Sequence, residues 1–240
     1  MKETKEIEKV KRLTKKVEGW LSDNEGELLY NLAKNCKGKG VIVEIGSWKG
    51  KSTIWLAKGS QAGPKVPVYA IDPHTGSSEH KKAFRKVWTF EEFKRNIRRV
   101  KVDDIVVPIV KTSKEAAKDF DKPIELIFID GAHEYEFVKK DFELWFPKVV
   151  DGGVMAFHDT IAWPGPRAVV DKFVYKSRYF KSVKFIDSIT FAQKGKNSLS
   201  DRIKNRQILL FKKIYELSSK LPLPKSIKKF GKAVLKFLKI

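Results

Sequence analysis

Carboxylates and a histidine stand at the ends of four strand-length apolar runs of this sequence, Glu44 just inside its run and the others just after theirs. They are, in chain order, Glu44, Asp72, Asp130 and the pair His158-Asp159. In an open parallel sheet the carboxyl ends of the strands meet at one edge, and ligands bind there. We therefore expect these side chains to share one site, and their oxygen and nitrogen atoms to bind a cationic ligand, ribose hydroxyls or a divalent metal.

The first run leads into Gly-Ser-Trp-Lys-Gly-Lys-Ser at residues 46–52. Gly46 and Gly50 let the backbone approach a ligand, and the helix that follows presents free amides. A dinucleotide site would need Gly-x-Gly-x-x-Gly, which is absent, so NAD is disfavoured.

A phosphate-binding loop is the second alternative for the same residues. It needs four residues between its first glycine and Gly-Lys-Ser, whereas this loop has three. Glu44 would also repel a triphosphate. Because Gly50-Lys51-Ser52 and the apolar run into Asp130 still imitate both halves of an ATPase signature, a nucleotide-binding ATPase or phosphotransferase stays an alternative.

S-adenosylmethionine fits these residues better. Glu44 can meet its ammonium group, and the amides after Gly46 suit its carboxylate. Asp72, 28 positions after Glu44, can accept hydrogen bonds from both ribose hydroxyls. A lone aspartate after a strand often only forms a turn, but the pair of acids at this spacing favours the cofactor.

At this point the sequence resembles the class I S-adenosylmethionine-dependent methyltransferases, over about residues 24–194. Within them it is similar to the branch with macrocin O-methyltransferase and cephalosporin-hydroxylase-like proteins, and more distantly to catechol and caffeoyl-type O-methyltransferases. Four motifs in order carry the resemblance: Val43-Glu44-Ile45-Gly46-Ser47-Trp48-Lys49-Gly50-Lys51-Ser52-Thr53, Ile71-Asp72-Pro73-His74, Phe128-Ile129-Asp130-Gly131-Ala132-His133-Glu134-Tyr135 and Gly152-Gly153-Val154-Met155-Ala156-Phe157-His158-Asp159-Thr160.

The resemblance implies a Rossmann-like α/β fold with strand order 3-2-1-4-5-7-6 and the cofactor over strands 1 and 2. It places Ser113 near the adenine. The cofactor-binding residues that we expect are Glu44, Gly46, Ser47, Trp48, Gly50, Ser52, Asp72, Ser113 and Asp130.

The resemblance also implies a divalent cation, usually magnesium, at the positions of Asp130, His158 and Asp159. His158 departs from the family, which more often has Asp or Glu there. A nitrogen ligand suits manganese, iron or zinc better than magnesium, so Mg or Mn both stay open.

Methyl transfer to an alcohol or phenol requires the hydroxyl to lose its proton. His133 matches the position where catechol-type enzymes carry a lysine base, and its ordinary pKa suits a general base near neutrality. We therefore expect His133 and Asp130 to be catalytic, although a lone histidine often only makes a structural hydrogen bond. Trp48 and Trp163 are candidates for ligand stacking or for packing, and His74 for facing either the acceptor or solvent.

The elements that position these residues follow from periodicity. Strands are predicted at Val41–Ile45, Val66–Ile71, Ile105–Val110, Ile124–Ile129, Val154–Phe157, Val183–Ile186 and Ile189–Ala192. Helices are predicted over residues 5–21, from a cap at Asp23 or Asn24, and at Lys51–Lys58, Glu91–Arg99, Lys114–Phe120 and Glu134–Phe146. The pattern predicts a seven-stranded, mostly parallel sheet with helices on both faces and a final antiparallel hairpin at Asp187-Ser188.

The chain has 240 residues, of which 42% are hydrophobic and 33% charged. This fits one large domain with appendages: an amphipathic helix at 1–22, a methyltransferase domain at 23–196 and a basic helical tail at 197–240. The single cysteine, Cys36, with no apolar signal or spanning segment, predicts a cytoplasmic protein.

The net charge is +21, and residues 201–240 hold 12 Lys or Arg against 2 acids. Abundant lysine resembles a thermophile's composition. Residues 225–240 form a basic amphipathic pattern that predicts peripheral contact with the inner membrane face, or else packing on the body or in a homo-oligomer. Nucleic acid is a less favoured partner because no ordered RNA-binding motif accompanies the charge.

The function predicted is O-methylation of a small-molecule, sugar or lipid-linked acceptor, assisted by a divalent metal. The acceptor's contacts are expected from loops at 72–88 and 160–167. A non-catalytic module that associates with membranes or RNA is the remaining alternative.

Overall fold

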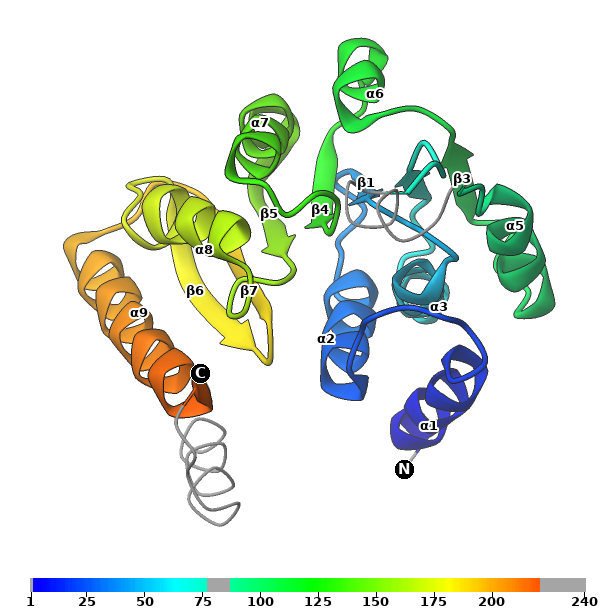
Figure 1. Cartoon of the computed structure of the whole chain (residues 1–240), viewed down its shortest axis with the longest axis horizontal. Helices are drawn as coiled ribbons and strands as arrows, with labels where there is room; N and C mark the ends of the chain where they lie inside the picture. The colour runs from blue at the N-terminus through cyan, green and yellow to red at the C-terminus, as the bar shows by residue number, and fades with distance from the viewer. Residues whose placement is uncertain (1, 77–86, 221–240) are drawn as a thin grey trace.

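A computed structural model describes residues 2–76 and 87–220 of the chain. Its centre is a seven-stranded sheet in the order β3-β2-β1-β4-β5-β7-β6, the order that the resemblance implies (Figure 1). The strands are β1 (Val41–Ile45), β2 (Val68–Ile71), β3 (Val106–Ile109), β4 (Ile124–Ile129), β5 (Val149–Phe157), β6 (Phe180–Ile186) and β7 (Ile189–Lys194).

The first five strands pair in parallel, and the β6–β7 hairpin closes one edge antiparallel to β5. This confirms the predicted sheet. β5 begins at Val149, earlier than its apolar run suggests, because its pairing with β4 extends to Val149 and Ile124 through a register shift. The glycines in between, Gly152 and Gly153, disguise that part of the strand in the sequence.

The helix before β1 and most of the crossover helices lie where the periodicity predicts them. They are α2 (Asp23–Lys34), α3 (Lys51–Ala62), α5 (Phe90–Arg99), α6 (Ser113–Asp119) and α7 (Tyr135–Trp145), followed by the short η1 (Phe146–Lys148). The N-cap of α2 is Ser22 rather than Asp23 or Asn24, because Ser22 and Glu25 form a reciprocal capping box. Two elements were not predicted: α8 (Pro164–Val170) and a π-helical turn, η2 (Asp171–Tyr175).

The first helix, α1 (Lys2–Thr14), is shorter than the predicted span of 5–21. Its apolar face is real, since Ile7 and Val10 are buried in the core. The Thr14 hydroxyl donates to the Val10 carbonyl, which competes with continuation of the helix. Trp20, inside the predicted span but beyond the end of α1, is 67% exposed.

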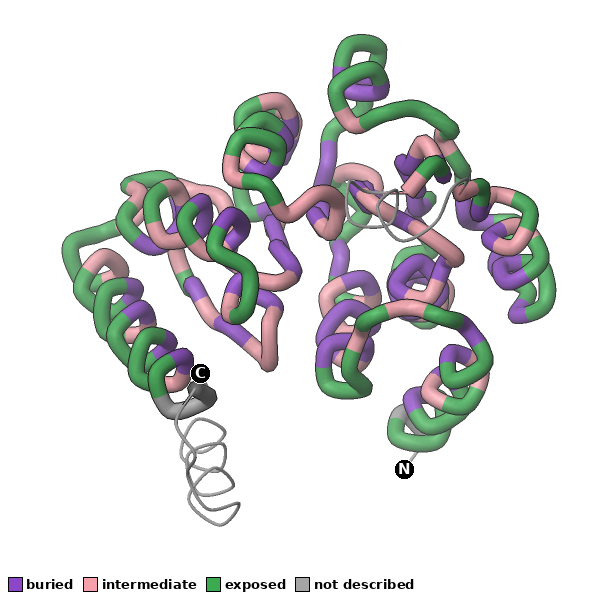
Figure 2. The backbone as a smooth tube through the Cα atoms, in the orientation of Figure 1, coloured by how far each residue is buried: buried purple, intermediate pink, exposed green. Residues whose placement is uncertain are grey.

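Helices cover both faces of the sheet, as predicted. Successive strand residues point to opposite sides, so Ile42 joins a core with α1, α2, α3 and α5, whereas Val43 joins a second core. That second core contains residues of α6, α7, α8, η2 and α9 (Leu199–Lys220). Figure 2 shows the buried strands between outer helices whose outward sides are exposed.

The C-terminal helix α9 packs on β6 and η2. Leu209 of α9 joins the second core, and the Lys212 side chain is fully buried, with its ammonium 3.1 Å from Asp171 and 2.9 Å from Glu216. The predicted basic helix at 225–240, and the Pro222 and Pro224 breaks before it, lie outside the described residues. Across 2–76 and 87–220, every helix is too short or too polar to cross a membrane.

The buried ion pairs of Lys212 give a test of how firmly α9 belongs to the folded body. Lys212→Ala should lower the free energy of unfolding by about 3 kcal/mol, because Asp171 and Glu216 lose their buried cation. The neighbouring Lys213→Ala is the control: its side chain is exposed, so the change should stay within about 0.5 kcal/mol. Urea denaturation would measure both, and equal midpoints would contradict this packing.

Candidate active site

The predicted acids meet at the carboxyl edge of the sheet. Each is held there by a hydrogen bond that extends a strand ladder by one residue. The amide of Asp72 donates to the Ile109 carbonyl at 3.1 Å, that of Asp130 to Ile45 at 2.8 Å and that of His158 to Ile129 at 3.0 Å. The backbone of the five parallel strands, β1 to β5, thus fixes where the side chains of Asp72, Asp130 and His158 begin.

Gly46 joins the tips of β1 and β4. Its φ is +87°, and a Cβ added there would lie 2.0 Å from the Asp130 carbonyl oxygen. Only glycine permits this approach. Gly50, with φ +89°, then starts α3, and its amide donates to the Ser47 carbonyl at 2.7 Å.

Asp72 organises the loop after β1. One carboxylate oxygen accepts the Trp48 amide at 2.7 Å, and the other accepts the His74 amide at 2.6 Å. Trp48 and His74 both have positive φ, which non-glycine residues adopt rarely. Because a carboxylate has about four acceptor positions, Asp72 keeps capacity for two ribose hydroxyls.

Glu44 is fully buried beneath that loop. Ser52 and Thr53 of α3 hydrogen-bond it, and one of its oxygens, Oε1, has no hydrogen-bond partner among the described residues. Burial is the main cause that raises the pKa of Glu44 to about 8, and nearby Asp130 and Asp72 add to it. A buried acid with an unused oxygen fits a positively charged ligand group.

The other expected cofactor residues lie around these two acids. Ser47 is buried, and the structure gives its hydroxyl no hydrogen-bond partner within the described ranges. Trp48 is half-buried, with its ring centroid 6.2 Å from that of Trp20.

Ser113 lies at the start of α6, and its hydroxyl is already engaged in packing. It donates to Asp141 of α7 and accepts from the Trp145 indole nitrogen at 2.8 Å. Its side chain therefore ties α6 to α7. An adenine beside it would contact the surrounding backbone rather than a free hydroxyl.

Asp130, His158 and Asp159 form the predicted cluster of metal-ligating groups. The His158 Nδ1 lies 3.0 Å from an Asp130 oxygen and 3.2 Å from an Asp159 oxygen. One ligand atom from each residue lies within 4.8 Å of the others. This set of two carboxylates and one imidazole fits a divalent transition metal such as manganese.

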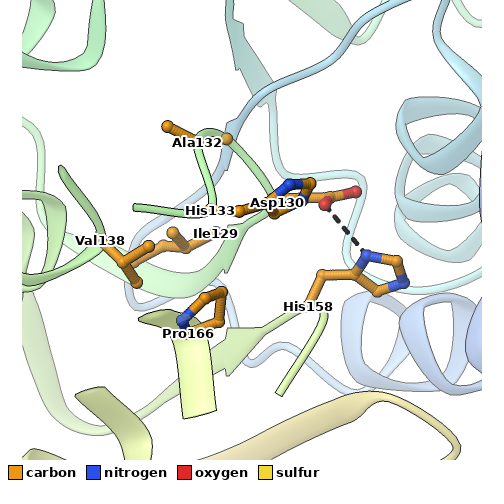
Figure 3. Close-up of a pocket in the computed structure, with 8 residues that line it drawn as sticks. Ile129, Asp130, Ala132, His133, Val138, His158 and Pro166 are labelled. Atoms are coloured by element: carbon orange, nitrogen blue, oxygen red, sulfur yellow. Dashed lines mark ion pairs between the residues drawn. The ribbon is translucent and has the colours of Figure 1, made fainter. Parts of the chain in front are cut away.

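His133 lies beside this cluster. Figure 3 shows its side chain together with those of Asp130 and His158. Its Nε2 is 3.0 Å from the Asp159 carboxylate, and its ring stacks on Trp163 at 4.2 Å between centroids. His133, His158, Asp130 and Pro166 of α8 are among the residues that line a small pocket. Trp163 is thus a packing partner of the candidate base, with 38% of its surface exposed.

Glu25 of α2 is a site residue that sequence reasoning missed. Its Oε2 lies 3.5 Å from the His158 Nε2, and its Oε1 accepts the Ser188 amide at 2.9 Å and the Ser188 hydroxyl at 2.7 Å. Burial opposes its charge, but His158 and these donors lower the pKa of Glu25 to about 2. In the sequence Glu25 is only one of two acids in the first turn of α2, and no motif marks it as a site residue.

The three acids determine the charge of His158. Burial disfavours its protonated form, but Asp130, Asp159 and Glu25 outweigh burial and hold the pKa of His158 well above its usual value. His74 is different. It does not face solvent, because it is fully buried among Phe90 and Phe93, and burial lowers its pKa.

The comparisons with known proteins agree with this site. Residues 43–160 match the model of a family described as a methyltransferase domain. With the sheet order and the acids on its first two strands, this match identifies residues 43–160 as a methyltransferase domain of the class I S-adenosylmethionine-dependent type. The chain spans 13%, 57% and 45% of the length of the first three curated relatives it matches.

One of these relatives is a catechol O-methyltransferase from Niastella koreensis, 32% identical over 111 residues, or 46% of this chain and 45% of that protein. Among solved structures, the O-methyltransferase NovP is 21% identical, with a TM-score of 0.63 over 71% of this chain and 79% of NovP. TomG of Streptomyces achromogenes, solved with S-adenosylmethionine, is 18% identical, with a TM-score of 0.57 over 79% of this chain and 89% of TomG.

The raised pKa of Glu44 predicts how stability depends on pH. Its carboxyl ionises near 8 in the ligand-free fold and near its ordinary 4.5 when unfolded, so stability falls as pH rises from about 4.5 through about 8. Glu44→Gln removes this ionisation. The difference in free energy of unfolding between the variant and wild type should therefore increase, by about 1 to 4 kcal/mol, as pH rises from 5 to 9.

Denaturation of both ligand-free proteins at several pH values would measure this difference. Glu125→Gln is a matched control. Glu125 is also buried, on the neighbouring strand β4, but both of its carboxylate oxygens accept hydrogen bonds, from the amides of Lys37 and Lys39. Parallel pH curves for wild type and Glu44→Gln would contradict the assignment.

Proposed function

We propose that this protein transfers a methyl group from S-adenosylmethionine to a hydroxyl of a small-molecule, sugar or lipid-linked acceptor, with a divalent metal assisting. The observation that carries the proposal is the pair of acids on β1 and β2. Glu44 keeps an unused buried oxygen, and Asp72 keeps acceptor capacity while it orders the intervening loop.

In this proposal each strand tip binds one part of the cofactor. Glu44 meets the ammonium group, and the backbone after Gly46 meets the carboxylate, with Ser47 beside it. Asp72 accepts from the ribose. The remaining residues line the site: Trp48, Gly50, Ser52, Ser113 and Asp130. S-adenosylmethionine supplies a methyl group on a positively charged sulfur, which an oxygen takes by in-line displacement.

Asp130, His158 and Asp159 would hold the metal. A bound divalent cation lowers the pKa of a coordinated hydroxyl. Glu25 supports this set from behind, because it contacts the His158 nitrogen opposite the one that faces the two aspartates. Such partners behind a ligating histidine fix its ring orientation.

His133 is the proposed base. It would take the proton of the acceptor hydroxyl on its imidazole ring. The carboxylate of Asp159, 3.0 Å from its Nε2, stabilises the imidazolium that this transfer creates. Stacking on Trp163 fixes the plane of the ring while the proton moves.

The phosphate-binding alternative is not favoured by the site. The lysine that such a loop would direct at phosphates is Lys51, and its ammonium instead donates to the Gly19 carbonyl at 2.8 Å. The nearby Glu44 and Asp72 would also repel a triphosphate.

Calorimetry with S-adenosylmethionine and with ATP tests the proposal. S-adenosylmethionine should bind, and Asp72→Asn should weaken its binding by about 10- to 100-fold through the lost charged hydrogen bonds to ribose. Asp151→Asn, an exposed change at the other end of β5, should leave binding unchanged. Binding of ATP without S-adenosylmethionine would overturn the function.

The metal is tested separately by titrating Mn²⁺ and Mg²⁺ into the protein. Mn²⁺ should bind more tightly because His158 contributes nitrogen. Asp159→Asn should lower its affinity by about tenfold or more, whereas Asp151→Asn should not. Undiminished affinity in Asp159→Asn would remove that residue from the ligand set.

Other partners stay predictions. A cytoplasmic location, a homo-oligomer and membrane contact through residues 225–240 all rest on the sequence, and that basic segment lies outside the described residues.

A further inference from the structure

The exposed and buried sides of α9 are inverted relative to an ordinary surface helix. Its buried positions are largely polar: Asn205, Leu209, Lys212 and Glu216. Its large apolar residues are instead exposed, by 51% to 65% at four positions: Ile203, Leu210, Ile214 and Leu217. A helix that only covered a core would show the opposite pattern.

The polar contacts prevent α9 from rotating to bury its apolar residues. The Asn205 side chain donates to the Phe180 carbonyl at 2.9 Å and accepts the Val183 amide at 3.4 Å. Lys212 pairs with Asp171 and Glu216. Turning the helix would leave these buried groups unpaired, which opposes any gain from burying the exposed side chains.

The apolar residues form one continuous stripe. Ile203, Leu210, Ile214 and Leu217 recur at helical spacing, so they lie along a single side of α9, with Leu199 one turn earlier. We call these five residues the α9 stripe. Figure 1 places α9 at the outer end of the molecule, beyond β6, and the stripe residues are exposed among the residues that the structure describes.

Basic residues flank the α9 stripe. By helical spacing, Lys204 lies on one side of it, and Arg206 and Lys213 lie on the other, and all three are exposed. The two acids of α9 are used elsewhere. Glu216 faces Lys212, and Asp201 accepts the Ser198 amide at the helix N-terminus.

An apolar stripe between cationic margins fits an anionic lipid surface. Such helices lie in the membrane interface with apolar side chains inserted and basic ones at the headgroups. A symmetric pairing of two copies through this stripe would instead bring basic margins together. The following 20 residues, 221–240, add six lysines and no acid, which extends the same charge along the chain.

We infer that the outward face of α9, comprising the α9 stripe and its basic margins, is a docking surface for membranes rich in anionic lipid. The inference stands independently of the methyl-transfer function, because no residue of the strand-tip site takes part in it.

Vesicle sedimentation with the full chain tests this inference. Wild type should bind phosphatidylglycerol-containing vesicles, bind pure phosphatidylcholine vesicles much less, and lose binding as salt rises. The double variant Leu210→Ser with Ile214→Ser should partition about tenfold less or lower still, although it retains every lysine of 221–240. Lys204→Glu with Lys213→Glu should lose binding to the anionic vesicles as well.

Matched controls separate the stripe from general surface changes. Phe137→Ser on α7 removes another exposed apolar side chain, and Lys118→Glu on α6 reverses another exposed charge. Both control variants should bind the anionic vesicles as well as wild type does. Circular dichroism melts should match wild type for all variants, because every substituted residue is exposed.

Three results would overturn the inference. One is wild type that ignores anionic vesicles. Another is a Leu210→Ser, Ile214→Ser protein that binds them as well as wild type, which would assign binding to other residues. The third is a stripe variant that still binds vesicles like wild type but loses another property of wild type. That property would be dimerisation in ultracentrifugation or binding to an RNA homopolymer.

Discussion

Crowding of negative charge at one edge of the sheet is the constraint on which this structure depends. Parallel strands end side by side, so acids at the ends of four of them are brought together whatever else the chain does. Each acid is stabilised differently. Glu44 holds its proton, Asp72 accepts two backbone amides, and Asp130 and Asp159 share the imidazole of His158.

These differences assign the two halves of the site to different ligands. The half around Glu44 is buried and has a carboxylate oxygen with no hydrogen-bond partner among the described residues. In the proposed function this favours a cationic ligand group that contacts the oxygen directly, without intervening water. The half around His158 is held together by ion pairs, and its Asp130 is partly exposed. In the proposed function this would let the two aspartates exchange the charge of the imidazolium for that of a metal ion.

The strands and the acids at their ends could be predicted because a strand covered on both faces is a continuous apolar run, and its next residue is at the edge. The order of the strands came from the family resemblance. Glu25 could not be found in this way, because its partner His158 is remote in sequence and only folding brings them together. The inverted orientation of α9 could not be predicted for a related reason. A lysine is expected at the surface, and only the folded structure brings Asp171 and Glu216 to the buried ammonium of Lys212. The β-branched residues of α8, such as Val169 and Val170, obscured that helix.

Gly165 sets a limit on how this protein could be redesigned for other acceptors. A Cβ there would lie 2.0 Å from the His133 carbonyl oxygen, so α8 begins in direct backbone contact with the segment that carries the candidate base. At the other end of the loop, the Thr160 amide donates to the Ser188 carbonyl at 2.9 Å. A connection anchored this closely at both ends tolerates new side chains at Ile161 and Ala162 but not inserted residues, so acceptor preference would have to change by exchange of side chains rather than by loop grafting.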